Sequence, residues 1–356
     1  AMPKSLAPRA APILVKMGPH AAAAYEPVNV LGRGAFGTAF AVRFKADGRM
    51  MVLKRVELGH MAPDARKEAF NECAVLAKLR DGPFIIRVSE HFEELSRLWI
   101  AMEIADGGDM ARAIAEAAEA DGGRGRPFQA EQVVTWALQI CIALEHAHRL
   151  KVLHRDLKPQ NIFLTKRGDV RLGDFGISRL LSSSLSVAAT CVGTPLYLAP
   201  EICEGKPYGA SCDVWSLGIL LHELLLLRPP FHANSMPALV VMICSKEPPP
   251  LPSSYPHPLR QLAVDALNKD PEARPSVAAM LASPSLAGGV VAMRAHAAAI
   301  VQAVAAAEQA TEDASAKRKG AATRTSELRE AQAKQKARAE SNQTPEEEAV
   351  ARDEAA

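Results

Sequence analysis

The stretch HRDLKPQNIFLTKRGDVRLGDFG, residues 154–176, constrains the fold more than any other part of the chain. Its central IFLTKRGDVRLG surrounds a turn at Gly168 with β-type residues, which predicts two short antiparallel strands. A hairpin of this kind returns the end of the stretch to its beginning. We therefore expect four polar side chains to share one site: Asp156, Lys158, Asn161 and Asp174.

These four side chains form the set that phosphoryl transfer requires. Such a transfer needs positioning and charge neutralisation around an in-line displacement, and little covalent chemistry from the protein. In this interpretation Asp156 orients the acceptor hydroxyl and takes its proton, while Lys158 stabilises the γ-phosphoryl group. Asn161 and Asp174 are the candidate metal ligands, because magnesium takes one or two carboxylates together with phosphate oxygens.

The rest of the pattern predicts an α+β fold with two lobes. From Tyr25 to about Val56, β-type runs alternate with glycines, and further strands are expected around 84–92 and 97–104. Apolar residues at helical spacing over 64–80 predict one helix beside this antiparallel sheet. Later amphipathic and apolar segments predict a larger, mainly helical lobe, with a ligand-binding cleft between the two lobes.

A glycine-rich loop, LGRGAFGTAF, opens the sheet lobe with the pattern G-x-G-x-x-G. Glycines let a backbone approach phosphates closely and present N–H groups to them. A strand follows this loop, whereas a dinucleotide-binding unit would turn into a helix, so that class of site is excluded. Lys54 on the next strand is placed to reach phosphates, with Glu72 as its expected acidic partner and Glu68 as the alternative.

Composition narrows the classes of partner. The net charge of +2 over 356 residues is too near balance to favour nucleic acid or an anionic membrane. The six cysteines form no CxxC pair, which argues against zinc and favours free thiols in a reducing, cytoplasmic compartment. The densest apolar run, VWSLGILLHELLLL, is 14 residues long and carries His222 and Glu223, so we expect a buried helix and no membrane span.

The two ends of the chain differ from its middle in composition. Residues 1–24 are basic and free of acids, and we expect a disordered leader, with a transit peptide as the weaker alternative. Residues 286–356 form an alanine-rich, charged tail, in which we expect 290–310 to be a solvated helix that fades into disorder. Self-association of the tail through a coiled coil is the alternative, although a sustained heptad is absent.

In motif order and spacing, residues 25–285 resemble the eukaryotic protein kinases. The motifs that carry this resemblance are the Gly-rich loop, MVLK, HRDLKPQN, DFG, CVGTPLYLAPE and DVWSLG. The resemblance implies a bilobal kinase fold in which Asp213 braces the catalytic loop and Arg274 pairs with Glu201. Lys158 in HRDLKPQN and Thr194 in GTP are typical of the serine/threonine branch, so protein serine and threonine hydroxyls are the implied acceptors.

Within that branch the sequence is most similar to the NIMA-related kinases, through NECAVLAKL, QNIFLTKRGDVRLGDFGISR and CVGTPLYLAPEIC. The resemblance implies ATP as phosphoryl donor, Mg²⁺ or alternatively Mn²⁺ as metal, and a role in cell-cycle, microtubule or ciliary signalling. The implied location is the cytoplasm, with the cytoskeleton, cilium or nucleus as alternatives. A pseudokinase scaffold and a serine/threonine kinase of another subfamily remain the competing functions.

The resemblance also assigns a nucleotide site. The implied binding residues are Leu31, Gly32, Arg33, Gly34, Ala35, Phe36, Gly37, Ala39, Val52, Lys54, Met102, Glu103, Ala105 and Asp109. Ala39 and Val52 depart from the usual valine and alanine, but both are apolar, so adenine stacking should survive. Met102 is the implied gatekeeper, followed by backbone hydrogen bonds to adenine from Glu103 and Ala105. Asp109 is expected to meet the ribose or a basic substrate residue, to cap a helix, or both.

A regulatory site follows from the same resemblance. Thr190 stands where NIMA-related kinases carry their activating threonine, and its phosphate is expected to bind Arg155, interpreted as a partly buried cation without a counter-charge. His154 is implied to be a structural residue packed under the DFG segment rather than a catalytic base. Ile177, which directly follows DFG, favours threonine over serine as the acceptor.

Overall fold

The computed structural model describes residues 17–34, 37–59, 61–175, 196–310, 313 and 332–337. The chain consists of two units, residues 1–301 and residues 302–356. The first unit contains both lobes and every candidate site residue that the structure describes. Three residues for which the sequence predicts a role in the acceptor site or in regulation, namely Ile177, Thr190 and Thr194, lie outside the described residues.

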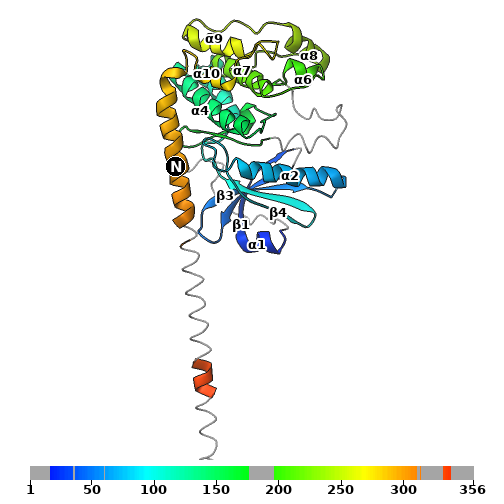
Figure 1. Cartoon of the computed structure of the whole chain (residues 1–356), viewed down its shortest axis with the longest axis vertical. Helices are drawn as coiled ribbons and strands as arrows, with labels where there is room; N and C mark the ends of the chain where they lie inside the picture. Colours follow the sequence, from blue (N-terminus) through cyan, green and yellow to red (C-terminus); the bar gives the residue numbers. More distant parts are fainter. Residues whose placement is uncertain are drawn as a thin grey trace, which may run out of the picture. The chain divides into compact units, whose positions relative to one another are not determined.

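A five-stranded antiparallel sheet forms the first lobe (Figure 1). Its strands are β1 Tyr25–Gly34, β2 Gly37–Phe44, β3 Met50–Glu57, β4 Val88–Glu94 and β5 Arg97–Glu103, in the spatial order β1-β2-β3-β5-β4. Helix α2, Pro63–Lys78, lies beside the sheet and contacts β4. In β3, Met51 and Leu53 are buried while Val52 and Lys54 are more exposed, because successive side chains of a strand point to opposite faces.

The expectation of a disordered leader up to residue 24 is wrong for the last residues of that segment. Pro19–Ala24 forms helix α1, which directly precedes β1. The backbone N–H groups of His20 and Ala21 donate to the carboxylate of Glu94 on β4, at 2.6 and 3.1 Å. The first N–H groups of a helix have no partner within it, so a carboxylate from β4 satisfies them and holds α1 against the sheet.

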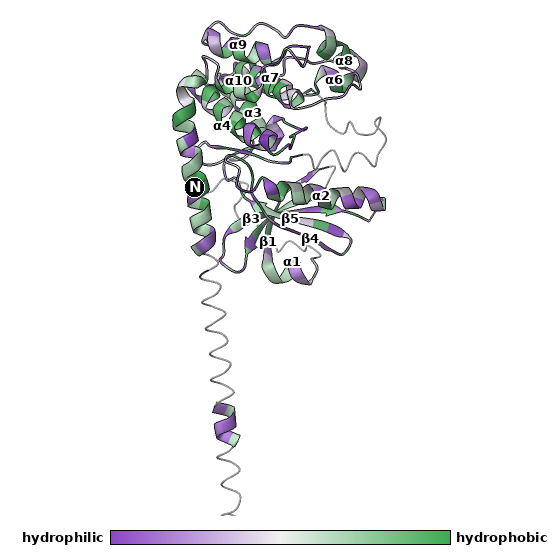
Figure 2. Cartoon of the chain, viewed as in Figure 1, coloured by the Kyte–Doolittle hydropathy of each residue, from purple (hydrophilic) through white to green (hydrophobic). Residues whose placement is uncertain are grey.

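The second lobe is mainly helical (Figure 1). Its helices are α3 Met110–Gly123, α4 Ala130–Arg149, α6 Pro200–Cys203, α7 Ser211–Leu226, α8 Met236–Ser245, α9 His257–Ala266 and α10 Val277–Leu281, with a 3-10 turn η1, Pro159–Asn161. Helix α7 is buried over most of its length, as its apolar sequence predicts. Figure 2 shows the hydrophobic residues that gather around α4 and α7 in this lobe. Strands β6 Ile162–Leu164 and β7 Val170–Leu172 form a small separate sheet.

One more helix, Ala287–Ala310, follows α10. Its residues up to 301 belong to the first unit, where Ala297 is buried and three apolar side chains pack against the core of the helical lobe: Val290, Met293 and Ile300. The expected helix is present and most of its residues are exposed, but up to residue 301 one face packs against the helical lobe, which the expectation of a solvated helix did not include.

The composition of this helix bears on a second expectation, that no segment of the chain spans a membrane. Among the described residues, Ala287–Ala310 is long and apolar enough to cross a membrane, with a mean hydropathy of 1.6 over an 18-residue window. The sequence argument considered only runs of large apolar residues and so missed an alanine-rich segment. A single helix that passes this test by length and composition is weak evidence for a membrane span, and only 6% of the window is buried.

Candidate active site

The hairpin of β6 and β7 brings the two predicted metal ligands together. Asn161 ends the turn η1 immediately before β6, and Asp174 follows β7 by two residues. The N–H of Gly173 donates to the carbonyl oxygen of Asn161 at 2.9 Å, so the backbones of the two flanks are in direct contact. The strand–turn–strand predicted from residues 162–173 is therefore present, and it positions Asn161 beside the segment that carries Asp174.

Asp156 is held by two of its predicted neighbours. The ammonium of Lys158 lies 2.8 and 2.9 Å from the two carboxylate oxygens of Asp156. The side-chain nitrogen of Asn161 donates to the backbone carbonyl of Asp156 at 2.7 Å and to its Oδ2 at 2.8 Å. Because the amide nitrogen of Asn161 is used in this way, its Oδ1 is the atom suited to bind a cation.

Lys54 meets Asp174 across the two lobes. Its Nζ lies 2.6 Å from Oδ1 of Asp174, and the two side chains are 15% and 25% exposed. The sequence analysis expected an acid on α2 as the partner of this lysine. The side chains of Glu72 and Glu68 lie outside the described residues, so the expected Lys54–Glu72 pair stays a prediction. In the structure, the acid described at Lys54 comes from the other lobe.

Asp213 on α7 holds the backbone of the catalytic loop. Its carboxylate accepts from the N–H groups of His154 and Arg155 at 2.9 and 2.8 Å, and from Nε2 of His148 at 2.8 Å. Arg155 adopts a positive φ of 66°, a conformation that persists only where surrounding contacts hold it. Burial acts to raise the pKa of Asp213, but the hydrogen bond from His148, the charge of His154 and the N–H of Arg155 lower it overall. The ionised carboxylate is therefore the form that the loop requires.

Two residues next to Asp156 differ in their surroundings. His154 is fully buried, and its ring lies 4.5 Å from that of Phe175 in the DFG segment, as expected for a structural residue. Burial lowers the pKa of His154, although the charges of Asp213 and other nearby carboxylates act to raise it. The side chain of Arg155 is exposed, so its interpretation as a partly buried cation is wrong.

The glycine loop requires glycine at Gly37. Gly34 ends β1 and pairs with Gly37 at the start of β2, with Ala35 and Phe36 outside the described residues. Gly37 has a φ of +143°, and a Cβ there would lie 1.9 Å from the carbonyl oxygen of Arg55 on β3. Both the conformation and the space therefore exclude a larger residue. The preceding residues Leu31, Gly32 and Arg33 are exposed.

The remaining residues of the predicted nucleotide site lie on neighbouring strands. Val52 pairs with the predicted gatekeeper Met102, and Ala39 pairs with Lys54. These pairings follow from the antiparallel register of β2, β3 and β5, which places the four residues side by side.

Two residues with predicted nucleotide contacts, Glu103 and Asp109, already make hydrogen bonds within the protein. The N–H of Glu103 donates to the carbonyl of Arg87 at 2.9 Å, so the predicted backbone hydrogen bond from Glu103 to adenine would have to use its carbonyl. The side chain of Asp109 accepts from the N–H of Arg112 at 2.8 Å and caps α3. The helix-capping role predicted for Asp109 is present, and the structure describes no partner that tests its role toward ribose. Ala105 follows β5 in the connection to α3.

Some residues of the site have no sequence signal of their own. His148, which bonds Asp213, precedes it by 65 positions, and nothing in the local sequence couples the two. Arg274 and Glu201, in contrast, form the buried ion pair that the resemblance implies, with two N–O contacts of 2.7 Å.

Among the described residues, no group of three or more His, Cys, Asp or Glu side chains gathers around a metal position. This is compatible with a metal held by one carboxylate, one amide and substrate phosphates.

Comparison with known proteins agrees with this geometry. Residues 25–286 match the protein kinase domain family. Serine/threonine-protein kinase Nek1 of Mus musculus is 44% identical over 257 residues, which are 72% of this chain and 21% of that protein. Nek5 of Homo sapiens is 40% identical over 74% of this chain and 36% of its own length. Nek3 of Mus musculus is 40% identical over 74% of this chain and 50% of its own length.

The match spans half or less of the length of each of these three relatives. The family match, residues 25–286, covers the two-lobed region described above. The expected family, the two-lobed α+β fold and the serine/threonine branch are confirmed within that region. The chain belongs to the protein kinase family, and its kinase domain is of the NIMA-related serine/threonine type.

Proposed function

We propose that this chain is an active kinase that transfers the γ-phosphoryl group of ATP to serine or threonine hydroxyls of proteins. The observation that carries the proposal is the convergence of Asp156, Lys158 and Asn161 in one hydrogen-bonded cluster, next to the Lys54–Asp174 pair. No position required for transfer is replaced, which disfavours the alternative of a pseudokinase scaffold.

The residues present fit a nucleotide with a divalent cation. Oδ1 of Asn161 and the carboxylate of Asp174 are hard oxygen donors, the ligand type that Mg²⁺ prefers, and we propose Mg²⁺ over Mn²⁺ for this reason. The bound cation neutralises charge on the phosphates during transfer. Gly37 is required by the close approach of the Arg55 carbonyl on β3, so it fixes the backbone at the end of the glycine loop.

Each side chain then has one role. Asp156 accepts the proton of the substrate hydroxyl as that oxygen bonds to the γ-phosphorus and the bond to the leaving ADP oxygen breaks. Lys158 bonds the Asp156 carboxylate in this structure and is placed to stabilise charge on the transferred group. Lys54 holds Asp174 and is placed to hold the nucleotide phosphates. Asp213 keeps the catalytic loop in its strained conformation through the N–H groups of His154 and Arg155.

The deciding experiment measures phosphate transfer and nucleotide binding separately on the full chain. With ATP, Mg²⁺ and a generic protein acceptor, we expect turnover, and Asp156→Asn should lower it by about 10²–10⁴-fold while nucleotide still binds. Asp174→Asn should remove transfer and weaken metal-dependent binding. Glu116→Gln on the exposed face of α3 is the matched control and should change neither. Nucleotide binding without any turnover, before and after incubation with an activating kinase, would favour the scaffold.

The finer assignments are extensions of this proposal. The cytoplasm is the proposed location, and signalling in the cell cycle, at microtubules or at cilia is the proposed role. Peptide libraries that differ only in the acceptor methyl group would test the preference for threonine that Ile177 suggests, and faster phosphorylation of serine would refute it.

A further inference from the structure

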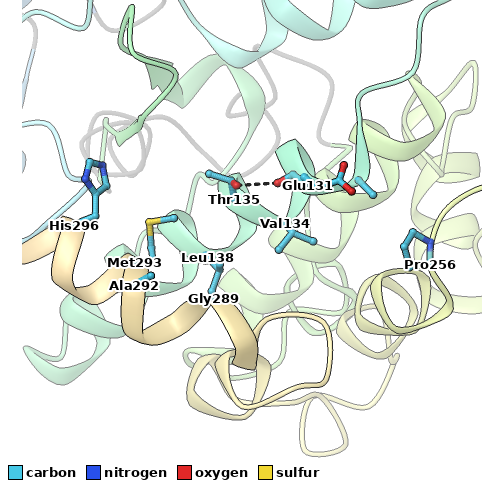
Figure 3. Close-up of a pocket in the computed structure, with 10 residues that line it drawn as sticks. Glu131, Val134, Thr135, Leu138, Pro256, Gly289, Ala292, Met293 and His296 are labelled. Carbon is cyan, nitrogen blue, oxygen red and sulfur yellow. Dashed lines mark hydrogen bonds between the residues drawn. The ribbon is translucent and has the colours of Figure 1, made fainter.

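The helix that follows the kinase domain packs on the side of α4. The region that matches the kinase family ends at residue 286, and the helix begins at Ala287. A Cβ at Gly289 would lie 2.7 Å from Cδ1 of Leu138 on α4, so the two helices approach closely there. Figure 3 shows Gly289, Ala292 and Met293 on one side of a groove of about 550 Å³ and Leu138 on the other.

His296 extends from this helix to the hairpin that carries the metal-ligand segment. Its Nε2 lies 2.9 Å from Oδ1 of Asp169, in the turn between β6 and β7. A carboxylate oxygen only accepts hydrogen bonds, so Nε2 is the donor. The imidazole also packs against the ring of Phe84, with the ring centres 5.9 Å apart. His296 is about half exposed and Asp169 is mostly buried, with side-chain exposures of 46% and 14%.

The turn of the hairpin is fixed from two helices. Oδ1 of Asp169 accepts from Nε2 of Gln139 on α4 at 2.7 Å, in addition to His296. Oε1 of Gln139 accepts from the N–H of Val170 at 2.7 Å, and Nε1 of Trp136 donates to the carbonyl of Gly168 at 3.2 Å. Helix α4 therefore fixes one side of the turn, and His296 adds a contact from outside the region that matches the kinase family.

Phe84 connects the same hairpin to the sheet lobe. Its carbonyl accepts from the N–H of Leu172 at 2.7 Å, and the N–H of Ile86 donates back to the carbonyl of Leu172 at 2.8 Å. Phe84 is buried and has a positive φ of 58°, a strained conformation that surrounding contacts must maintain. His296 thus touches Phe84 on one side of this junction and Asp169 in the turn of the hairpin. Leu172, which bonds Phe84, lies one residue before Gly173 and two before Asp174.

We propose that residues 287–301 form a brace for the β6–β7 hairpin, and that His296 is a positioning residue for Asn161 and Asp174. The brace acts by holding Asp169 and Phe84 together, so that the two flanks of the hairpin keep the spacing set by the bond between Gly173 and Asn161. The kinetic part of this inference, an effect on Mg-ATP binding, rests on the proposed metal-ligand role of Asn161 and Asp174. The mechanical part, the stabilisation of the hairpin by His296, does not depend on that role.

Hydrogen exchange on the full chain without nucleotide tests the mechanical part. His296→Ala should speed exchange of the Leu172 and Gly173 amides by roughly five-fold, the order expected when one bond to a charged group is lost at a half-exposed site. His296→Gln, which can still donate to Asp169, should restore most of the protection. Arg294→Ala is the matched control, because Arg294 lies on the same helix and pairs with Glu145 of α4 at 2.8 Å without touching the hairpin.

Steady-state kinetics test the positioning part. We expect His296→Ala to raise the KM for Mg-ATP about three-fold or more while the KM for the protein acceptor stays unchanged, and His296→Gln to reverse most of this rise.

Equal effects of Arg294→Ala and His296→Ala would mean that the helix only docks, and would overturn the role of His296. Unchanged exchange in His296→Ala would overturn the brace itself. Faster exchange with unchanged kinetics would overturn positioning. A wild type without transfer would refute the proposed function, while the exchange result would still decide the brace.

Discussion

The Nζ of Lys54 lies 2.6 Å from Oδ1 of Asp174, although the two residues are 120 positions apart. One belongs to β3 in the sheet lobe, and the other follows β7 in the helical lobe. The pair therefore joins the residue proposed to hold phosphates to a residue proposed to hold the metal. A substitution of Lys54 or of Asp174 therefore alters both the proposed phosphate position and the proposed metal position.

Replacement of Lys54 should abolish activity while leaving the free energy of unfolding almost unchanged. Lys54→Met is expected to abolish transfer and to weaken ATP binding by at least ~10-fold, because the cation for the phosphates is lost. The free energy of unfolding should change by only about 0–1 kcal/mol, since the pair is partly exposed to water. Calorimetric titration with ATP and chemical unfolding check the two parts. Lys166→Met, in an exposed pair with Asp106, is the control, and a wild-type ATP affinity in Lys54→Met would contradict the assignment.

The buried pair of Glu201 and Arg274 should matter for stability. Both side chains are almost fully buried, at 3% and 0% exposed, and they share two contacts of 2.7 Å. Glu201→Gln should lower the free energy of unfolding by about 3–5 kcal/mol, because it leaves a buried guanidinium without its counter-charge. Urea unfolding measures this loss.

The control for that change is an exposed pair of the same type. Arg112 and Glu116 are more than half exposed, so Glu116→Gln should change the free energy of unfolding by less than about 0.5 kcal/mol. A loss of similar size in the two variants would show that the burial of the Glu201–Arg274 pair has no special effect.

Glu223 should make stability depend on pH. Burial raises its pKa from the ordinary 4.5 to about 7, and its carboxylate bonds the hydroxyl of Tyr197. The folded state therefore keeps a proton that the unfolded state releases, so the free energy of unfolding falls as pH rises from 4.5 to 7. Above pH 7 this contribution is constant, and its total size is about 3 kcal/mol. Glu223→Gln stays neutral and should flatten the slope, measured as melting temperature against pH. Identical slopes in wild type and variant would contradict the raised pKa.

Thr190 remains the predicted regulatory site, although it lies outside the described residues. Arg155 directly precedes Asp156, and its exposed side chain is accessible to a phosphate from another segment. Thr190→Ala should therefore lose activation by phosphorylation, and Thr190→Glu should retain part of it, because phosphate carries about −1.5 to −2 charges. Activity after phosphatase treatment and again after incubation with ATP measures the effect. Full activation of Thr190→Ala, with loss of activation on replacing Ser182, Ser183, Ser184 or Ser186, would place the switch elsewhere.

Much of the site could be predicted because its members are close in sequence. Asp156, Lys158 and Asn161 lie within six positions, and a single hairpin returns the chain to Asp174. The expected strand of Lys54 and the helix after it were likewise predicted from periodicity, which is a local property. The helix α1 was missed because its first N–H groups are satisfied by Glu94, more than seventy positions later, and no local capping residue marks its start.

The sequence by itself determined most short-range features of this protein: the strands and most helices of the two lobes, the glycine loop, and the order of the catalytic residues. Only the tertiary structure decided which distant groups meet, such as Lys54 with Asp174, His148 with Asp213, and His296 with Asp169. The physical reason is one of range. Helical and strand periodicity depends on neighbours within a few residues, whereas a long-range ion pair or hydrogen bond exists only after apolar burial has brought its two segments together.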